Sequence, residues 1–262
     1  MRVTIFASGS TGNCLLLSDG DTRLLIDAGI SLRRMEAGLA QADCGMQDMA
    51  GVLITHEHSD HICGLTSLLK RYELPIFAPH TVAARLGAML PAAQDRLRVI
   101  PVGEPFPLGG LRLRAFHTPH DTEESVGYRA EGHGVFAIAT DTGCLTEELL
   151  EGLRGADTAL IEANHDERLL CDGPYPFRLK RRILSDRGHL SNARCAELAL
   201  SLAESGTRRL ILGHLSRENN TPALAMETVG RALEGSGTAL YCAPPLGCLT
   251  VPVGEEEPLC CL

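Results

Sequence analysis

Short apolar runs alternate with amphipathic stretches along most of the chain. Apolar runs flanked by Gly, Pro or polar residues are typical of strands, and apolar positions three or four residues apart are typical of helices. The strands expected on this basis are Arg2–Phe6, Cys14–Leu17, Arg23–Ile26, Gly51–Thr55, Pro75–Ala78, Leu111–Phe116, Ser125–Arg129, Val135–Thr140, Thr158–Glu162, Arg209–Leu212 and Thr238–Tyr241. The expected helices are Ser31–Ala40, His61–Arg71, Thr81–Met89, Thr146–Leu153, Tyr175–Ser185, Ser191–Ser205 and Thr221–Leu233.

The order of these elements indicates the fold class. Early strands follow one another through tight turns, whereas later strands are separated by helices. This pattern predicts an α/β or α+β fold in which helices cover sheets. We see no internal repeat and no low-complexity linker, so we expect one domain over residues 1–254. The stretch 255–262 begins with three glutamates and is expected to be a solvated acidic tail.

Composition narrows the class further. The 262 residues are 44% hydrophobic and 22% charged, which is ordinary for a globular protein. A net charge of −9 argues against general electrostatic binding of nucleic acid, so phosphate handling needs metal ions or a local basic patch. No transmembrane run or signal-peptide core is present, and the ten cysteines include no C-x-x-C pair. We therefore expect a cytoplasmic protein with free thiols and no membrane partner.

The stretch HEHSDH, at residues 56–61, follows a buried apolar strand directly. His56 and His58 are two residues apart on extended chain, so their side chains point to the same side. Asp60 and His61 are adjacent at an expected helix start and can face a second ion. A loop with histidines exposed by chance is the alternative, but three His and one Asp in six residues favour a divalent metal such as Zn²⁺.

Further candidate ligands follow other strands. Asp141 comes after the apolar run that ends at Thr140, and His214 comes after Arg209–Gly213. Taken alone, each could equally be a turn or loop residue. His117 and His120 compete for one role after the strand that ends near Phe116. We prefer His120, because the loop beyond Pro119 can turn toward the other strand ends.

With these residues the sequence resembles the metallo-β-lactamase fold superfamily. The stretch HEHSDH matches every fixed position of that superfamily's HxHxDH motif. The resemblance implies a four-layer αββα sandwich with two divalent ions, Zn²⁺ by preference, although Mn²⁺ or Fe also fit. It also implies that His56, His58 and His120 hold one metal, that Asp60, His61 and His214 hold the other, that Asp141 bridges them, and that Asp27 lies in the second shell. The motif does not select a substrate, because lactonases, glyoxalases and nucleases share it.

Two other stretches have residues suited to phosphate. The turn SGSTGNC, at 8–14, leaves backbone N–H groups free for an anion, although a plain hairpin turn explains it equally. The stretch GHLSN, at 188–192, opens a helix, whose N-terminus attracts anions, and basic residues precede it over 178–187. Ser191 could instead be only the helix N-cap. The candidate phosphate-binding residues are Ser10, Asn13, His189, Ser191 and Asn192.

Together with IEANHD and GHLSRENN, these stretches resemble the WalJ (YycJ) group of this superfamily, members of which are described as DNA exonucleases. The order Glu162, His189, His214 also resembles motifs of the nuclease branch that contains ribonuclease J. The chain lacks that branch's inserted cap domain and the long arm of ribonuclease Z, so the core itself must grip the substrate. The resemblance implies a metal-dependent 5′-to-3′ exonuclease acting on DNA, with Glu162 in the second shell.

The mechanism expected for such an enzyme uses a water activated between the two ions, which attacks phosphorus in line. Asp60 orients this water, and His189 stabilises charge or protonates the leaving oxygen. A small-molecule or cyclic phosphodiesterase, or an ester or lactone hydrolase, on the same metals is the main alternative. A diiron redox enzyme is disfavoured because His58 is intact, and a metal-free scaffold is disfavoured because all seven ligands are present. The sequence leaves monomer and homodimer equally open.

Overall fold

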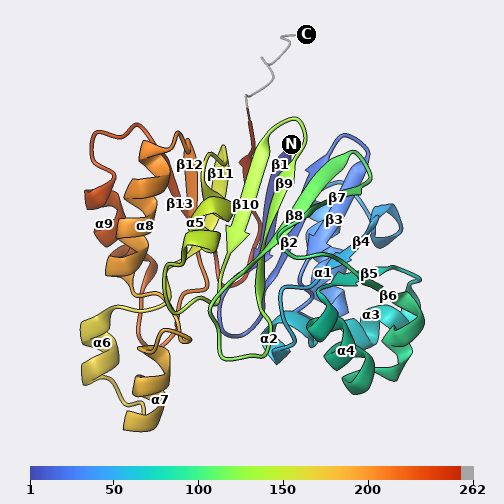
Figure 1. Cartoon of the computed structure of the whole chain (residues 1–262), viewed down its shortest axis with the longest axis horizontal. Coiled ribbons are helices and arrows are strands. Elements are labelled where there is room, and N and C mark those ends of the chain that lie inside the picture. Colours follow the sequence, from blue (N-terminus) through green and yellow to red (C-terminus); the bar gives the residue numbers. More distant parts are fainter. Residues whose placement is uncertain (255–262) are drawn as a thin grey trace.

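The computed structural model describes residues 1–254 and shows two seven-stranded sheets that face each other (Figure 1). The first sheet contains, in spatial order, β14 (Leu249–Pro252), β1 (Arg2–Ala7), β2 (Cys14–Asp19), β3 (Thr22–Ile26), β4 (Gly51–Leu53), β5 (Ile76–Ala78) and β6 (Leu97–Val99). The second contains β13 (Ala239–Cys242), β12 (Arg209–Gly213), β11 (Thr158–Glu162), β10 (Val135–Ala139), β9 (Val126–Glu131), β8 (Leu111–His117) and β7 (Pro105–Leu108).

Helices cover the outer face of each sheet, which completes four layers (Figure 1). The first sheet is covered by α1 (Leu32–Gln41), α3 (Leu65–Arg71) and α4 (His80–Met89), and the second by α5 (Glu147–Leu153), α8 (Asn192–Glu204) and α9 (Pro222–Ala232). The short helices are α2 (Ser59–Ile62), α6 (Glu167–Asp172) and α7 (Phe177–Ile183), with 3₁₀ turns at Met46–Asp48 and Pro91–Arg96. The expected αββα sandwich is therefore confirmed.

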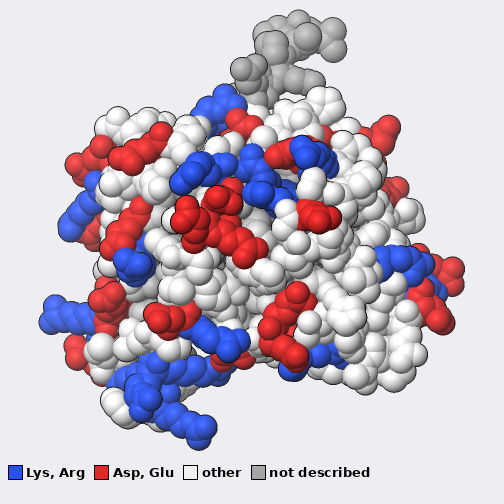
Figure 2. Space-filling view, viewed as in Figure 1, with Lys and Arg blue, Asp and Glu red and all other residues white. Residues whose placement is uncertain are grey.

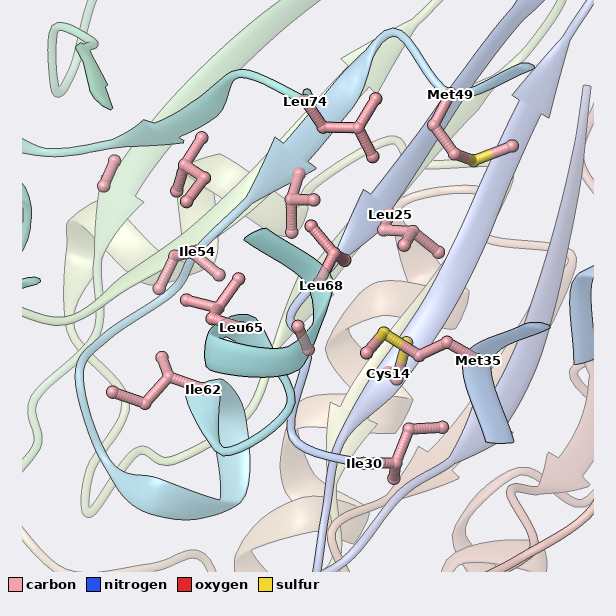
Figure 3. Close-up of a cluster of buried hydrophobic side chains, with 14 of the residues drawn as sticks. Cys14, Leu25, Ile30, Met35, Met49, Ile54, Ile62, Leu65, Leu68 and Leu74 are labelled. Carbon is pink, nitrogen blue, oxygen red and sulfur yellow. The ribbon is translucent and has the colours of Figure 1, made fainter. Parts of the chain in front are cut away.

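The alternation of side chains along each strand builds three apolar layers. On β2, Leu15 and Leu17 pack between the two sheets, whereas Leu16 packs against the helices of the first sheet. Figure 3 shows the latter layer, in which Leu65 and Leu68 of α3 lie over the sheet. A strand that is buried on both faces reads as a continuous apolar run, which is why the sequence pattern identified these strands.

The expected elements are present, with a few differences at their ends. The expected helix His61–Arg71 is two helices, because the backbone N–H of Gly64 donates to the carbonyl of Ala28 and a side chain at Gly64 would collide with this loop. The sequence patterns missed β6, β7, β14 and α6. Within residues 1–254, no helix combines the length and apolar character needed to span a bilayer.

The topology places the ends of several strands at one edge of the molecule. Strands β3 and β4 are parallel, as are β10, β11 and β12, so the carboxyl ends within each set meet. Such an edge is where open α/β sheets carry their sites. Asp27, Asp141 and His214 leave these strands with φ of 61°, 55° and 55°. Left-handed backbone costs energy for residues with a side chain, and such strain clusters at functional sites.

Candidate metal centre and adjoining cavity

The first of two overlapping clusters consists of three histidines. The Nε2 atom of His56 lies 3.1 Å from Nδ1 of His58, and Nε2 of His120 lies 3.3 Å from the same atom. These nitrogens lie within 4.8 Å of one another, close enough to hold one ion between them. His56 and His58 come from the loop after β4, and His120 comes from the loop after β8. The structure thus brings together the three side chains expected to hold one metal.

The second cluster adds two carboxylates. His61 and His214 each place Nε2 3.5 Å from Oδ2 of Asp60. Asp141 lies between the two clusters: its Oδ2 is 3.2 Å from Nε2 of His61, and its Oδ1 is 3.4 Å from Nε2 of His214 and 3.7 Å from Nε2 of His120. This central position is the one expected of a bridging carboxylate.

The other ring nitrogen of the buried histidines is held from outside the clusters. Nδ1 of His61 lies 2.7 Å from Oδ2 of Asp27, and Nδ1 of His214 lies 2.9 Å from Oε1 of Glu162. Because a carboxylate can only accept, these Nδ1 atoms carry a proton, and Nε2 is the nitrogen that faces the centre. Nδ1 of His120 faces the carbonyl of Gly188 at 3.2 Å in the same way. Metal-ligating histidines are oriented by such partners.

The electrostatics of the centre favour cations. Burial alone would lower the pKa of His214, but Asp141, Asp60 and Glu162 outweigh it and raise that pKa to about 10. By contrast, burial and the neighbouring His61 hold the pKa of His56 well below its usual value, so this ring is neutral. The negative potential that retains a proton on His214 is also one that attracts a divalent ion.

Unpartnered oxygens provide a test of whether metals fit this centre. Oδ2 of Asp141 and Oδ1 of Asp121 are buried and accept no hydrogen bond. Buried carboxylate oxygens without donors are costly unless something positive faces them. Together with the converging Nε2 atoms of His61 and His214, they form a donor set of imidazole and carboxylate, which suits a borderline divalent metal. The residues therefore fit divalent ions at both clusters.

His189 lies beside this centre without facing it in the same way. Its Nδ1 lies 2.7 Å from Oε1 of Glu162, the oxygen that also accepts from His214. The carboxylate of Glu162 is buried, and although burial would raise its pKa, His189 and His214 lower that pKa to about 2. Glu162 therefore stays ionised and holds both rings, which leaves Nε2 of His189 available to a substrate.

A cavity of about 150 Å³ adjoins His189 and His120. Ser10, Asn164 and Ser216 also line it, together with Leu179 of α7 and Tyr175 of the segment just before that helix. The opening of this cavity is where a substrate can reach the metal ligands. Ser10, one of the candidate phosphate-binding residues, is thus at the site.

The other candidate phosphate-binding residues have partners within the fold. The side-chain nitrogen of Asn13 lies 3.1 Å from Nε2 of His61 and 3.4 Å from the carbonyl of Asp60, so it braces the HEHSDH loop. Ser191 Oγ accepts from the backbone N–H of Arg194 and caps α8. Asn192 pairs with Asn220 through both side-chain amides. These contacts favour structural roles for the three residues.

The sequence did not show which partners several residues around the site have. Asp121 lies 3.2 Å from Nε2 of His120 and pairs with Arg182 of the basic helix. Arg187 is exposed, yet its guanidinium donates to the carbonyl of His120 and so supports this loop. His117, the competing histidine, is half-exposed and pairs with Glu148. Only contacts between segments far apart in the chain reveal these roles.

Comparison with known proteins agrees with this geometry. The model of the family described as "Beta-lactamase superfamily domain" matches residues 22–215. The chain therefore belongs to the beta-lactamase superfamily, whose fold implies the use of divalent metal ions.

Within that superfamily, the chain is similar to two proteins named for one activity. It is 36% identical to "Exodeoxyribonuclease YycJ" of Bacillus anthracis, over 90% of each chain. It is 37% identical to "Exodeoxyribonuclease WalJ" of Streptococcus pneumoniae, over 87% of this chain and 86% of that protein. The resemblance to the WalJ (YycJ) group is thus confirmed.

Solved structures of proteins with lower sequence identity confirm the fold. The Zn²⁺-bound PqqB of Methylobacterium extorquens has a TM-score of 0.71 at 21% identity, covering 97% of this chain and all of that one. The short form of human tRNase Z has a TM-score of 0.65 at 16% identity, with 97% and 100% covered. At these identities the likeness shows the shared architecture.

Proposed function

We propose that this protein is a metal-dependent exodeoxyribonuclease that removes nucleotides from the 5′ end of DNA. The observation that carries the proposal is the convergence, from both sheets, of seven side chains of the types that bind divalent metals. The similarity to two proteins named exodeoxyribonuclease, over most of each chain, supports DNA as the substrate. The 5′-to-3′ direction comes from the sequence resemblance and is for experiment to decide.

In this proposal, His56, His58 and His120 hold one ion, Asp60, His61 and His214 hold the other, and Asp141 touches both. When bound, two such ions polarise a phosphodiester and lower the pKa of water between them. Zn²⁺ is our first candidate, since imidazole is the main donor. Asp60, beside His61 and His214, would also orient the attacking water.

His189 acts on the leaving group as a general acid in the proposed reaction. Its Nδ1 is fixed by Glu162, so its free Nε2 points to the cavity, where it can donate a proton to the departing oxygen. Burial opposes a charged ring, but Glu162 raises the pKa of His189, which favours the protonated form that an acid needs.

The basic helix α7 supports a polyanionic substrate. Lys and Arg side chains gather at the end of the molecule where α7 lies (Figures 1 and 2). Arg178 and Arg181 are exposed, and within residues 1–254 neither forms an ion pair. In a chain of net charge −9, such a cluster suits contacts with the backbone of the strand. A DNA substrate and free cysteines also suit a cytoplasmic location.

A nuclease assay tests this function. Metal-stripped protein with Zn²⁺ or Mn²⁺ added back is given DNA and RNA labelled at either end, together with a p-nitrophenyl phosphodiester. We expect DNA to shorten from its 5′ end only when metal is present. Hydrolysis of the small diester or of an ester, with no shortening of DNA under any metal, would contradict the proposal and favour the small-substrate hydrolase that the modest cavity could also serve.

A further inference from the structure

The cavity beside the metal centre has two walls of different chemistry. One wall carries the metal ligand His120 and the polar residues His189 and Asn164. The other wall comes from α7 and the residue preceding its cap. It presents Tyr175, Leu179 and Ile183 beside Arg182, whose charge is paired with Asp121. Leu179 and Ile183 are four residues apart, so they share one face of the helix.

Among the described residues that line this cavity, Tyr175 is the one phenylalanine, tyrosine or tryptophan side chain, and it is partly exposed. Pro174 and Pro176 flank it, and Pro176 is held at φ −58° and ψ 145°, so the segment loses little entropy when it binds a ligand. Within residues 1–254 its hydroxyl forms no hydrogen bond, so the fold itself does not use the polar end of this side chain. The ring is therefore available to a ligand.

Like the cavity, a nucleotide has a polar side and an apolar side: its phosphate is charged, and the faces of its base are apolar. With its phosphate at the metal-binding wall, its base meets the apolar wall of the same cavity. Aromatic side chains stack on bases without regard to sequence, because every base has a π-face. Aromatic residues are only 4% of this protein, so a ring at this position is a specific feature of the cavity.

We infer that Tyr175 stacks on the base of the nucleotide that is being removed, with Leu179 and Ile183 completing an apolar base-binding wall. This inference rests on the proposed nuclease function and adds the feature of the substrate that the cavity recognises. It requires the terminal nucleotide to be unpaired when it is cut, because a base within a duplex cannot reach the ring. The end of a duplex substrate must therefore open first.

The test compares two single-stranded oligonucleotides that differ only at the end from which the enzyme degrades, one with a normal terminal base and one abasic there. For the wild type, we expect kcat/KM to be roughly 5- to 100-fold higher with the base present. Tyr175→Ala is expected to bring this ratio close to one, and Tyr175→Phe to keep it. Leu200→Ala, an exposed change on α8, is the matched control and should keep both the ratio and the wild-type rate.

Three outcomes overturn the inference. Tyr175→Ala could lower kcat/KM equally for both oligonucleotides and leave the ratio unchanged, as a merely structural role predicts. The wild type could also show no preference for the normal base. In both of these cases DNA is still degraded, so the proposed function stands. If the wild type degrades no DNA at all, the proposed function and this inference fail together.

Discussion

The histidines of the centre each use their two ring nitrogens for different partners. His61 donates through Nδ1 to Asp27 and His214 donates through Nδ1 to Glu162, so the opposite nitrogens converge. His189 also donates to Glu162, yet its free nitrogen points to the cavity. In the proposed reaction, His214 and His189 are held by the same carboxylate, but the first would bind metal and the second would act as an acid.

This difference predicts different losses in two alanine variants. His58→Ala removes a ligand, so we expect it to lose bound metal and all phosphodiester hydrolysis. His189→Ala should keep the metal, because its Nε2 faces the cavity, and lower kcat by about 10²–10⁴. Metal content by elemental analysis and kcat on a 5′-phosphorylated oligonucleotide measure the two effects. A His189→Ala variant with the wild-type kcat would show that the ring takes no part in the reaction.

The sequence could single out the candidate ligands at this scale because their signals are local. HEHSDH is six consecutive residues, and Asp141 and His214 stand directly after apolar runs. Asp121 has no such signal: it matters because Arg182, 61 residues away, pairs with it. Asn13 and Asn192 were expected to bind phosphate because amides suit that role, and only the fold shows which partners already occupy them.

Among the secondary-structure elements, α8 and α9 are joined at their N-terminal ends by a buried amide pair. Asn192 donates to Oδ1 of Asn220 at 2.9 Å, and Asn220 donates back at 2.8 Å. Asn192→Ala removes both of these buried hydrogen bonds. Asn220 still accepts from the backbone N–H of Thr221 and donates to the carbonyl of Ala163, but one of its N–H groups is left unmatched, so we expect the free energy of unfolding to fall by about 1–3 kcal/mol. Urea denaturation measures this change.

The double variant distinguishes this structural role from phosphate binding. Asn192→Ala combined with Asn220→Ala should cost less than the sum of the single changes, because the second change removes the unmatched groups. At a temperature where the single variant is folded, its KM for oligonucleotides should equal that of the wild type. A raised KM with unchanged stability would restore Asn192 to the phosphate-binding set.

Element patterns predicted the central strands and missed three of the four strands at the sheet edges. A central strand such as β11 is wholly buried, and its three middle residues are apolar, so the pattern marks it as a strand. The edge strand β7 contains Pro105 and Pro107, which read as strand breakers although an edge strand tolerates them. Strand β14 pairs with β1 at the other end of the chain, and this pairing depends on a distant partner rather than on its own sequence.

Across the whole molecule, Asp19 joins the end of β2 to the turn between β9 and β10. Its side chain accepts from the backbone and ring of His133 and lies 3.4 Å from the amino group of Met1. Burial opposes ionisation, but these partners outweigh it and lower the pKa of Asp19 below the ordinary 3.8. A lowered folded-state pKa stabilises the fold above pH 3.8, and this contribution is lost as the pH falls through the folded value.

Asp19→Asn should therefore be less stable than the wild type at pH 7, and the difference should narrow as the pH falls below about 4. Denaturation of metal-free protein at several pH values measures this, since metal loss at low pH would otherwise contribute. Asp21→Asn is the control. It changes an exposed carboxylate in the turn between β2 and β3, directly after Asp19, and should match the wild type. A constant difference across this pH range would mean that the charge of Asp19 is not what stabilises the turn.

The metal centre joins the two halves of the sandwich, because its ligands come from both sheets. His56, His58, Asp60 and His61 follow β4 of the first sheet, while His120, Asp141 and His214 follow strands of the second. An ion held by both sets binds only when the sheets are in place, so it stabilises the folded state. At a hundredfold excess over the dissociation constant this amounts to about 2.7 kcal/mol.

Removal of metal with a chelator should therefore lower the Tm by roughly 5–10 °C, and Zn²⁺ should restore it. His58→Ala should show a smaller rise in Tm with Zn²⁺, because one ion has lost a ligand, whereas His189→Ala should show the full rise. Thermal unfolding with metal content measured in parallel tests all three proteins. If metal binds the wild type without raising its Tm, the ions do not join the sheets, and the ligands must come together in the unfolded chain as well.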